Sequence, residues 1–180
     1  MKSPLIRPLA RCWLSAMLAC TLLAACANPP ASGGHAGFER GTVLQRVDRA
    51  LSLAEPGAAL RLSALVNPLV TGETLQVHLH AQQDGYVYLY QVTTDGRSLG
   101  LIFPNAYDSA NYLRSGQTLL PRGNWQLKAV GPAGTGYLLA VMTPKPLNLL
   151  ALLGDARQGQ IQLPPPYHAW LTALREVSAP

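Results

Sequence analysis

YVYLYQVTTDGRSLGLIFPN, residues 86–105, is the stretch that decides the fold. It reads as two β-strands joined by a tight turn at Asp95-Gly96, because Asp-Gly between apolar runs is typical of a hairpin turn that needs positive φ. Tyr86, Tyr88 and Tyr90 alternate with mainly aliphatic residues, so one face of the first strand is aromatic and the other mostly aliphatic. The stretch carries no catalytic group and therefore predicts a sheet.

The two-residue period continues on both sides of this hairpin, over residues 58–145. Turn signals rich in glycine, proline, asparagine and aspartate separate the apolar runs. Short strands at such spacing are typical of antiparallel sheets and not of βαβ units, so we expect a mainly β fold, an antiparallel β-sandwich of about seven strands with flanking N- and C-terminal helices. The expected strands are Leu60–Val66, Thr74–Ala81, Tyr86–Val92, Ser98–Phe103, Gln117–Leu120, Trp125–Val130 and Tyr137–Thr143.

Residues 40–55 are expected to form a helix that packs on the side of the sandwich. Thr42 and Gln45 have the spacing of a capping box, in which each side chain accepts from a backbone N–H at the start of the helix. Apolar residues recur on one helical face, and Pro56-Gly57 ends the pattern. A helix that binds a partner is the alternative.

Residues 146–180 are expected to form a C-terminal helical extension. The apolar run Leu147–Leu153 predicts a short buried helix that ends at Gly154-Asp155. After the stiff proline triplet 164–166, residues Tyr167–Val177 predict a second helix docked on the sandwich. The residues at helical spacing on its apolar face are Trp170, Leu171, Leu174 and Val177.

Residues 1–25 have the pattern of a secretory signal. A basic start precedes the apolar run WLSAMLACTLLAA, which is shorter than the about 20 residues that cross a bilayer. The run ends in Leu23-Ala24-Ala25-Cys26, which resembles the bacterial lipobox. That resemblance implies that a peptidase recognises Leu23, Ala24 and Ala25 and cuts before Cys26. It also implies a covalent diacylglycerol and an N-acyl chain on Cys26.

Several acyl chains give stable anchoring in a membrane. Ala27 stands where an aspartate would resemble an inner-membrane retention signal, so we expect delivery to the outer membrane, facing the periplasm. Residues 26–39 begin with the lipidated cysteine and continue as a flexible tether of proline, glycine, serine and alanine. A second lipobox candidate at Cys20, and an ordinary cleaved signal with an incidental cysteine, are the alternatives.

Charge and cysteine usage narrow the classes of function. The formal charge of +5 falls to +2 when Lys2, Arg7 and Arg11, which lie in the predicted signal, are removed. The remaining basic residues are scattered and form no basic face, which gives nucleic-acid binding little support. All three cysteines lie in the first 26 residues, so the mature domain is expected to have neither a disulfide framework nor a cysteine metal site.

The mature chain carries no motif typical of an enzyme, such as a GxSxG elbow or a free thiol. Gly131–Gly136 resembles a nucleotide-binding P-loop, but Tyr137 and Leu138 stand where lysine and Ser or Thr are required. His78 and His80 share one face of an expected strand, yet no third metal ligand is evident, so they are weak candidates. We therefore expect no nucleotide, no metal and no cofactor besides the acyl chains.

A series of short motifs runs through the predicted sandwich. In chain order they are Gly85-Tyr86, Asp95-Gly96, Phe103-Pro104-Asn105, Gly116-Gln117-Thr118 and Gly131-Pro132-Ala133-Gly134. This order resembles the bacterial family "domain of unknown function 4384", over about residues 60–145. The resemblance implies a compact, β-rich, extracytoplasmic module, often an accessory beside other domains or in lipoproteins, and brings no established catalytic residue. Gly136 departs from the pattern, because the family often has an acidic residue there.

The candidate interaction site is the loop that follows Phe103. Phe103 is expected to be buried, Pro104 to stop the strand and Asn105 to close the turn through its side chain. Tyr107, Tyr112 and Trp125 are expected to pack in the core or at its rim, with a binding surface beside this loop as the alternative.

Together these features predict a lipid-anchored, periplasmic, non-catalytic binding or scaffold module of the cell envelope, with an envelope protein as partner. One alternative is an accessory subunit of a trans-envelope secretion machine, which an uncovered apolar patch would favour. A second is an envelope hydrolase, which a cleft with paired carboxylates or a His–acid pair would favour. A third is a small-ligand carrier, which needs an apolar cavity of about 300 Å³ or more.

Overall fold

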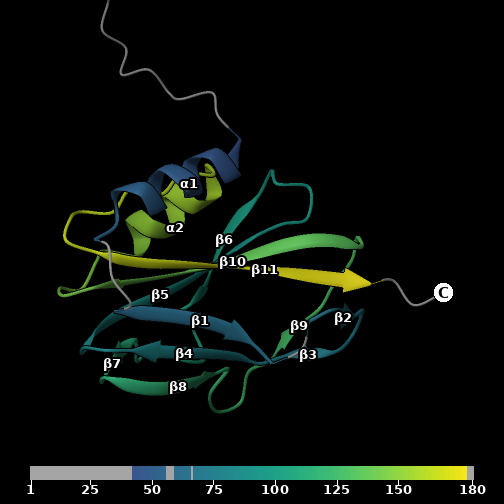
Figure 1. Ribbon diagram of the computed structural model, residues 1–180, viewed down its shortest axis with the longest axis horizontal. Helices are drawn as coiled ribbons and strands as arrows, with labels where there is room; N and C mark the ends of the chain where they lie inside the picture. Colours follow the sequence, from purple (N-terminus) through teal and green to yellow (C-terminus); the bar gives the residue numbers. More distant parts are fainter. Residues whose placement is uncertain (1–41, 56–58, 66, 178–180) are drawn as a thin grey trace, which may run out of the picture. The chain divides into compact units, whose positions relative to one another are not determined.

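The computed structural model describes residues 42–55, 59–65 and 67–177, all within one compact unit of residues 39–180 (Figure 1). The predicted mainly β fold with antiparallel sheets and flanking helices is confirmed. The elements are α1 (Val43–Leu53), β1 (Leu60–Ala64), β2 (Leu69–Val70), β3 (Thr74–Leu75), β4 (Val77–Ala81), β5 (Gly85–Val92), β6 (Leu99–Phe103), β7 (Tyr112–Leu113), β8 (Gly116–Leu120), β9 (Leu127–Lys128), β10 (Gly134–Thr143), α2 (Leu149–Arg157) and β11 (His168–Val177).

A six-stranded sheet lies at the centre of the fold. Its strand order is β2-β11-β10-β5-β6, and β7 pairs with the start of β5. The predicted aromatic face of β5 is confirmed, since Tyr88 and Tyr90 are buried among side chains of α1 and α2. The opposite face of β5, with Val87 and Leu89, packs in a second apolar core. One strand of the hairpin thus separates two cores.

A three-stranded sheet, β1-β4-β8, covers the aliphatic face of the central sheet, and α1 and α2 cover the aromatic face (Figure 1). Within it, Leu79 lies opposite Leu62 on one side and Thr118 on the other. Leu62 and Leu79 point into the core, whereas Arg61 and His80 are exposed on the outer face. The alternation expected of half-buried strands therefore holds.

The capping box of α1 forms as predicted. The N–H of Gln45 donates to Thr42 Oγ1 at 3.3 Å, and the N–H of Thr42 donates to Gln45 Oε1 at 2.8 Å. Val43, Val47 and Ala50 are the buried residues of this helix. The cap fixes where the helix starts, and the apolar stripe fixes which face meets the sheet.

The predicted helix over Tyr167–Val177 is wrong, because His168–Val177 is the strand β11. It pairs antiparallel with β10 over nine residue pairs, from Gly134–Glu176 to Met142–His168. Its end also pairs in parallel with β2. Apolar residues face both layers of this sheet, so their spacing matches a helix as well as a buried strand. Pairing with β10 decides between the two.

The second difference in the C-terminal extension is α2, which begins at Leu149, two residues later than predicted. It runs through Gly154 and ends at Arg157, with Gly159 at a φ of 66° just beyond. An isolated glycine costs a helix only about 1 kcal/mol, so it does not end one by itself. The helix is also less buried than expected, since only Leu152 and Ala156 are buried in it.

The central hairpin is confirmed, but its loop is longer than the tight turn predicted. β5 ends at Val92 and β6 begins at Leu99. Gly96 has a φ of 66°, as its position in the turn requires. The Asp95 carboxylate accepts from the hydroxyl of Thr93 at 2.6 Å and from the N–H of Arg97 at 2.9 Å, and these bonds lower its pKa. Side-chain bonding thus stabilises a six-residue loop.

Candidate functional site

The predicted interaction loop begins where β6 ends. Phe103 is fully buried and Pro104 is buried beside it, as expected. Asn105 closes the turn through its side chain: its amide group donates to the carbonyl of Ile102 at 2.9 Å. Its side-chain oxygen accepts from the N–H of Tyr107 at 2.9 Å and of Asp108 at 3.0 Å. One asparagine therefore satisfies three backbone groups that the turn leaves open.

A bidentate ion pair holds the middle of the loop. Arg122 Nε lies 2.9 Å from Asp108 Oδ2, and Arg122 Nη2 lies 2.7 Å from Oδ1. The same guanidinium donates to the carbonyl of Ala110 at 2.6 Å and lies over the ring of Phe103, 5.3 Å from its centre. Sequence reasoning missed this pair, because a separation of fourteen residues gives no local signal.

The acidic partner of this pair is the more buried one, since only 10% of the Asp108 side chain is exposed, against 34% for Arg122. The hydrogen bond from Arg122 is the largest cause that holds the pKa of Asp108 below its usual range, and burial of the carboxyl opposes it. Both carboxylate oxygens accept from Arg122, so the pair acts as a brace for the loop.

Tyr107 and Tyr112 are the rings that the loop presents to solvent, with 75% and 52% of each residue exposed. Tyr112 meets Tyr86 edge to face, with 5.0 Å between ring centres and 63° between the ring planes. Asn111 ties the same part of the loop to β5, because its carbonyl accepts from the N–H of Val87 at 2.8 Å and its amide donates to the Val87 carbonyl at 3.2 Å. The structure thus brings Tyr112 to a fixed aromatic edge.

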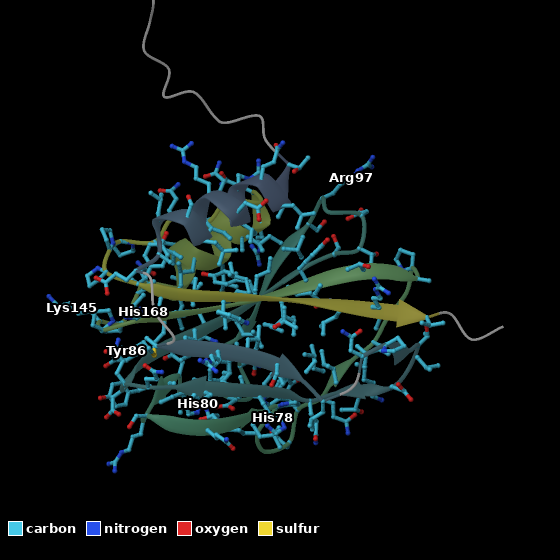
Figure 2. The ribbon with its side chains drawn as sticks, in the orientation of Figure 1. His78, His80, Tyr86, Arg97, Lys145 and His168 are labelled. Atoms are coloured by element: carbon cyan, nitrogen blue, oxygen red, sulfur yellow. The ribbon has the colours of Figure 1, made fainter. Side chains whose placement is uncertain are left out.

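The two weak metal candidates lie apart from this loop, on the outer face of the three-stranded sheet (Figure 2). His80 is exposed and lies opposite Arg61, whose positive charge disfavours a cation there. His78 is half-buried, and its Nε2 has no hydrogen-bond partner. No group of three or more potential metal ligands exists among the residues with a described placement.

Sequence reasoning also missed a contact of His168 at the start of β11. Its Nε2 lies 3.6 Å from Glu55 Oε2 and 2.8 Å from Gln83 Nε2. The N–H of Glu55 donates to the carbonyl of Tyr167 at 2.9 Å, and the Tyr167 hydroxyl donates to the carbonyl of Ala50 at 2.6 Å. These contacts join α1 and the residues that follow it to the start of β11, and the His–acid pair is one of them.

A cavity of about 90 Å³ lies at the end of the sandwich where β9 and β10 meet. Leu75, Leu138 and Leu174 line its apolar part, and Lys128 and Glu176 lie among its polar residues. Pockets that hold a small-molecule ligand usually measure about 300–1,000 Å³, so this cavity does not meet the need of a carrier. The P-loop-like glycines lie at its margin, where Gly134 begins a strand and no helix follows.

Comparison with known proteins agrees with the order of the motifs. Residues 69–146 match the model of the family described as "Domain of unknown function (DUF4384)", which confirms the resemblance. No curated protein and no solved structure matches the chain. The matched segment runs from β2 to beyond β10 and contains the whole interaction loop, whereas α1, β1, α2 and β11 lie outside it.

Asp108→Asn is expected to make the free energy of unfolding depend less on pH in the acidic range. Because the folded-state pKa of Asp108 is lowered, its contribution is present above the unfolded value of about 3.9 and is lost as the pH falls through the folded value. We expect a loss of about 1–3 kcal/mol at pH 6 and a smaller loss at pH 3. Urea unfolding at both pH values measures this. Asp48→Asn, on the exposed face of α1, is the control, and an equal loss at both pH values contradicts the assignment.

Proposed function

We propose that this protein is a non-catalytic binding or scaffold module of the bacterial cell envelope. In this proposal acyl chains on Cys26 anchor it in the outer membrane, and the loop after Phe103 binds an envelope protein in the periplasm. The observation that carries the proposal is a braced loop that holds Tyr107 and Tyr112 exposed. We define these two residues as the tyrosine pair.

Rigid presentation of the tyrosine pair supports binding more than catalysis. Tyrosine is enriched among the residues that contribute most to protein interfaces, because it offers a large contact area and a hydroxyl at little entropic cost. The bonds of Asn105, Asn111 and Arg122 fix the loop before any partner arrives, which lowers the cost of binding. The side chains of Asn105, Asp108 and Asn111 already bond within the chain, whereas Tyr107 and Tyr112 stay exposed.

The accessory-subunit alternative has one observation in its favour, which is an uncovered apolar patch. Leu149, Leu150 and Leu153 of α2 are exposed to 37%, 81% and 36%. A subunit of a trans-envelope secretion machine would use such a patch in addition to the tyrosine pair. The scaffold proposal and the accessory-subunit alternative share the same lipid anchor and the same interaction loop.

The anchor has its own test, because Leu23, Ala24, Ala25 and Cys26 lie outside the described residues. We expect the native protein to fractionate with membranes and to carry the added mass of its acyl chains. Cys26→Ala is expected to lose both properties, since the lipobox at residues 23–26 then has no thiol to accept the diacylglycerol, whereas Cys20→Ala is expected to keep both. The proposed anchor would be overturned if Cys26→Ala stayed with the membranes and changed the measured mass only by the substitution itself.

A further inference from the structure

The helix α2 is apolar on the side that faces away from the sheet. Leu152 and Ala156 pack against the central sheet, in the core that Tyr88 and Tyr90 share. Leu149, Leu150 and Leu153 lie on the solvent side. We call these three residues the leucine face. Adjoining exposed apolar side chains often mark an interaction site, and within the described part of the chain no element covers the leucine face.

The N-terminal chain enters the fold in the same layer. Both helices lie on one side of the central sheet, and the three-stranded sheet lies on the other (Figure 1). Arg46 of α1 donates to the carbonyl of Gly159, just after α2, so the two helices are joined. Thr42 starts α1, and 15 residues separate it from Cys26.

The length of that connection limits how far the helical layer can move from a membrane. A flexible chain of 15 residues has a root-mean-square span of about 20 Å and reaches at most about 50 Å. If Cys26 is acylated, as the proposed function states, Thr42 at the start of α1 stays within this distance of the bilayer, and the helical layer follows it. The tether then makes even a weak apolar contact favourable, because it raises the effective concentration of the membrane.

We propose that the leucine face seats on the surface of the bilayer that holds the acyl chains. A lipid surface fits the face better than a protein partner does, for two reasons. Three leucines cover far less than the about 800 Å² per partner of a stable protein interface. The helix α2 also contains no Trp or Tyr, which are enriched in protein hot spots. An exposed aliphatic surface also supplies a second membrane contact beside the acyl chains, and stable anchoring takes two such signals.

The test uses the full lipidated chain in vesicles of phosphatidylethanolamine and phosphatidylglycerol. A nitroxide label is placed at Ala151→Cys, which is exposed on α2 and leaves the leucines intact, and in a second protein at Ser63→Cys, exposed on β1. Intact mass first shows whether Cys26 carries its acyl chains. Paramagnetic accessibility is then measured with oxygen, which partitions into lipid, and with a nickel complex, which stays in water.

We expect a several-fold higher ratio of oxygen to nickel accessibility at position 151 than at position 63, on vesicles only. Leu149→Ser with Leu150→Ser should abolish the difference, whereas Leu119→Ser, an exposed leucine of β8, should preserve it. Equal ratios at both positions in an acylated protein would overturn the seating but leave the anchor intact. A label at position 151 that is immobilised and poor in oxygen would show that protein covers the face, and would also overturn it. If the added mass of the acyl chains is missing, the proposed anchor on Cys26 is itself contradicted.

Discussion

A chain that ends at residue 166 is expected not to fold, although it keeps the whole matched segment 69–146. The reason is that β11 supplies a strand next to β10, with nine residue pairs, from outside that segment. Its removal also deletes Tyr167, whose hydroxyl and carbonyl both bond to α1 and the residues that follow it. A typical domain has a total stability of only about 5–15 kcal/mol, so we expect the loss of a ten-residue strand from the central sheet to unfold it.

Circular dichroism and thermal melting measure this loss. A chain that ends at Val177 is the matched control, because it lacks only the last three residues and keeps all of β11. It should melt cooperatively. Cooperative melting of the chain that ends at residue 166 would show that the matched segment folds without β11, and would contradict the role given to that strand.

Phe103→Ala is expected to lower the free energy of unfolding by about 3–5 kcal/mol. The ring is fully buried in the core between the two sheets, opposite Leu89 in the ladder of β5 and β6. Its removal leaves a cavity and takes away the surface over which the Arg122 guanidinium lies. We therefore expect the loop to lose both the packing of the Phe103 ring and the contact that positions Arg122.

Urea unfolding of the native protein, Phe103→Ala and Tyr107→Ala measures the contribution of the buried ring. Tyr107→Ala is the control within the same loop, and as an exposed residue it should change stability by no more than about 0.5 kcal/mol. A loss below about 1 kcal/mol for Phe103→Ala would mean that the site collapses around the smaller side chain. The role given to Phe103 in supporting the loop would then be wrong.

Local signals in the sequence were sufficient for parts of the fold. The capping box of Thr42 and Gln45 and the closure of the turn by Asn105 both act within three residues, so their spacing alone predicts them. The alternation of tyrosines in β5 is also local, since one period assigns each side chain to a face. These predictions held because no distant element competes with them.

Distant partners decided the rest. β11 is a strand because β10 pairs with it, and its own apolar spacing also fits a helix. The ion pair of Asp108 and Arg122 and the contact of Glu55 and His168 join residues far apart in the chain. The exposure of the leucine face depends likewise on where α2 lies on the sheet. None of these follows from composition, periodicity or spacing.

The central claim is that the tyrosine pair binds an envelope protein, and site-specific photocrosslinking in intact cells tests it most directly. A photoreactive residue at position 107 is expected to give one reproducible crosslinked protein, and a residue at position 112 the same one. Position 119, on an exposed leucine of β8, is the control and should give none. The claim would be contradicted if neither position 107 nor position 112 gave a crosslinked protein. It would also be contradicted if position 119 gave the same products.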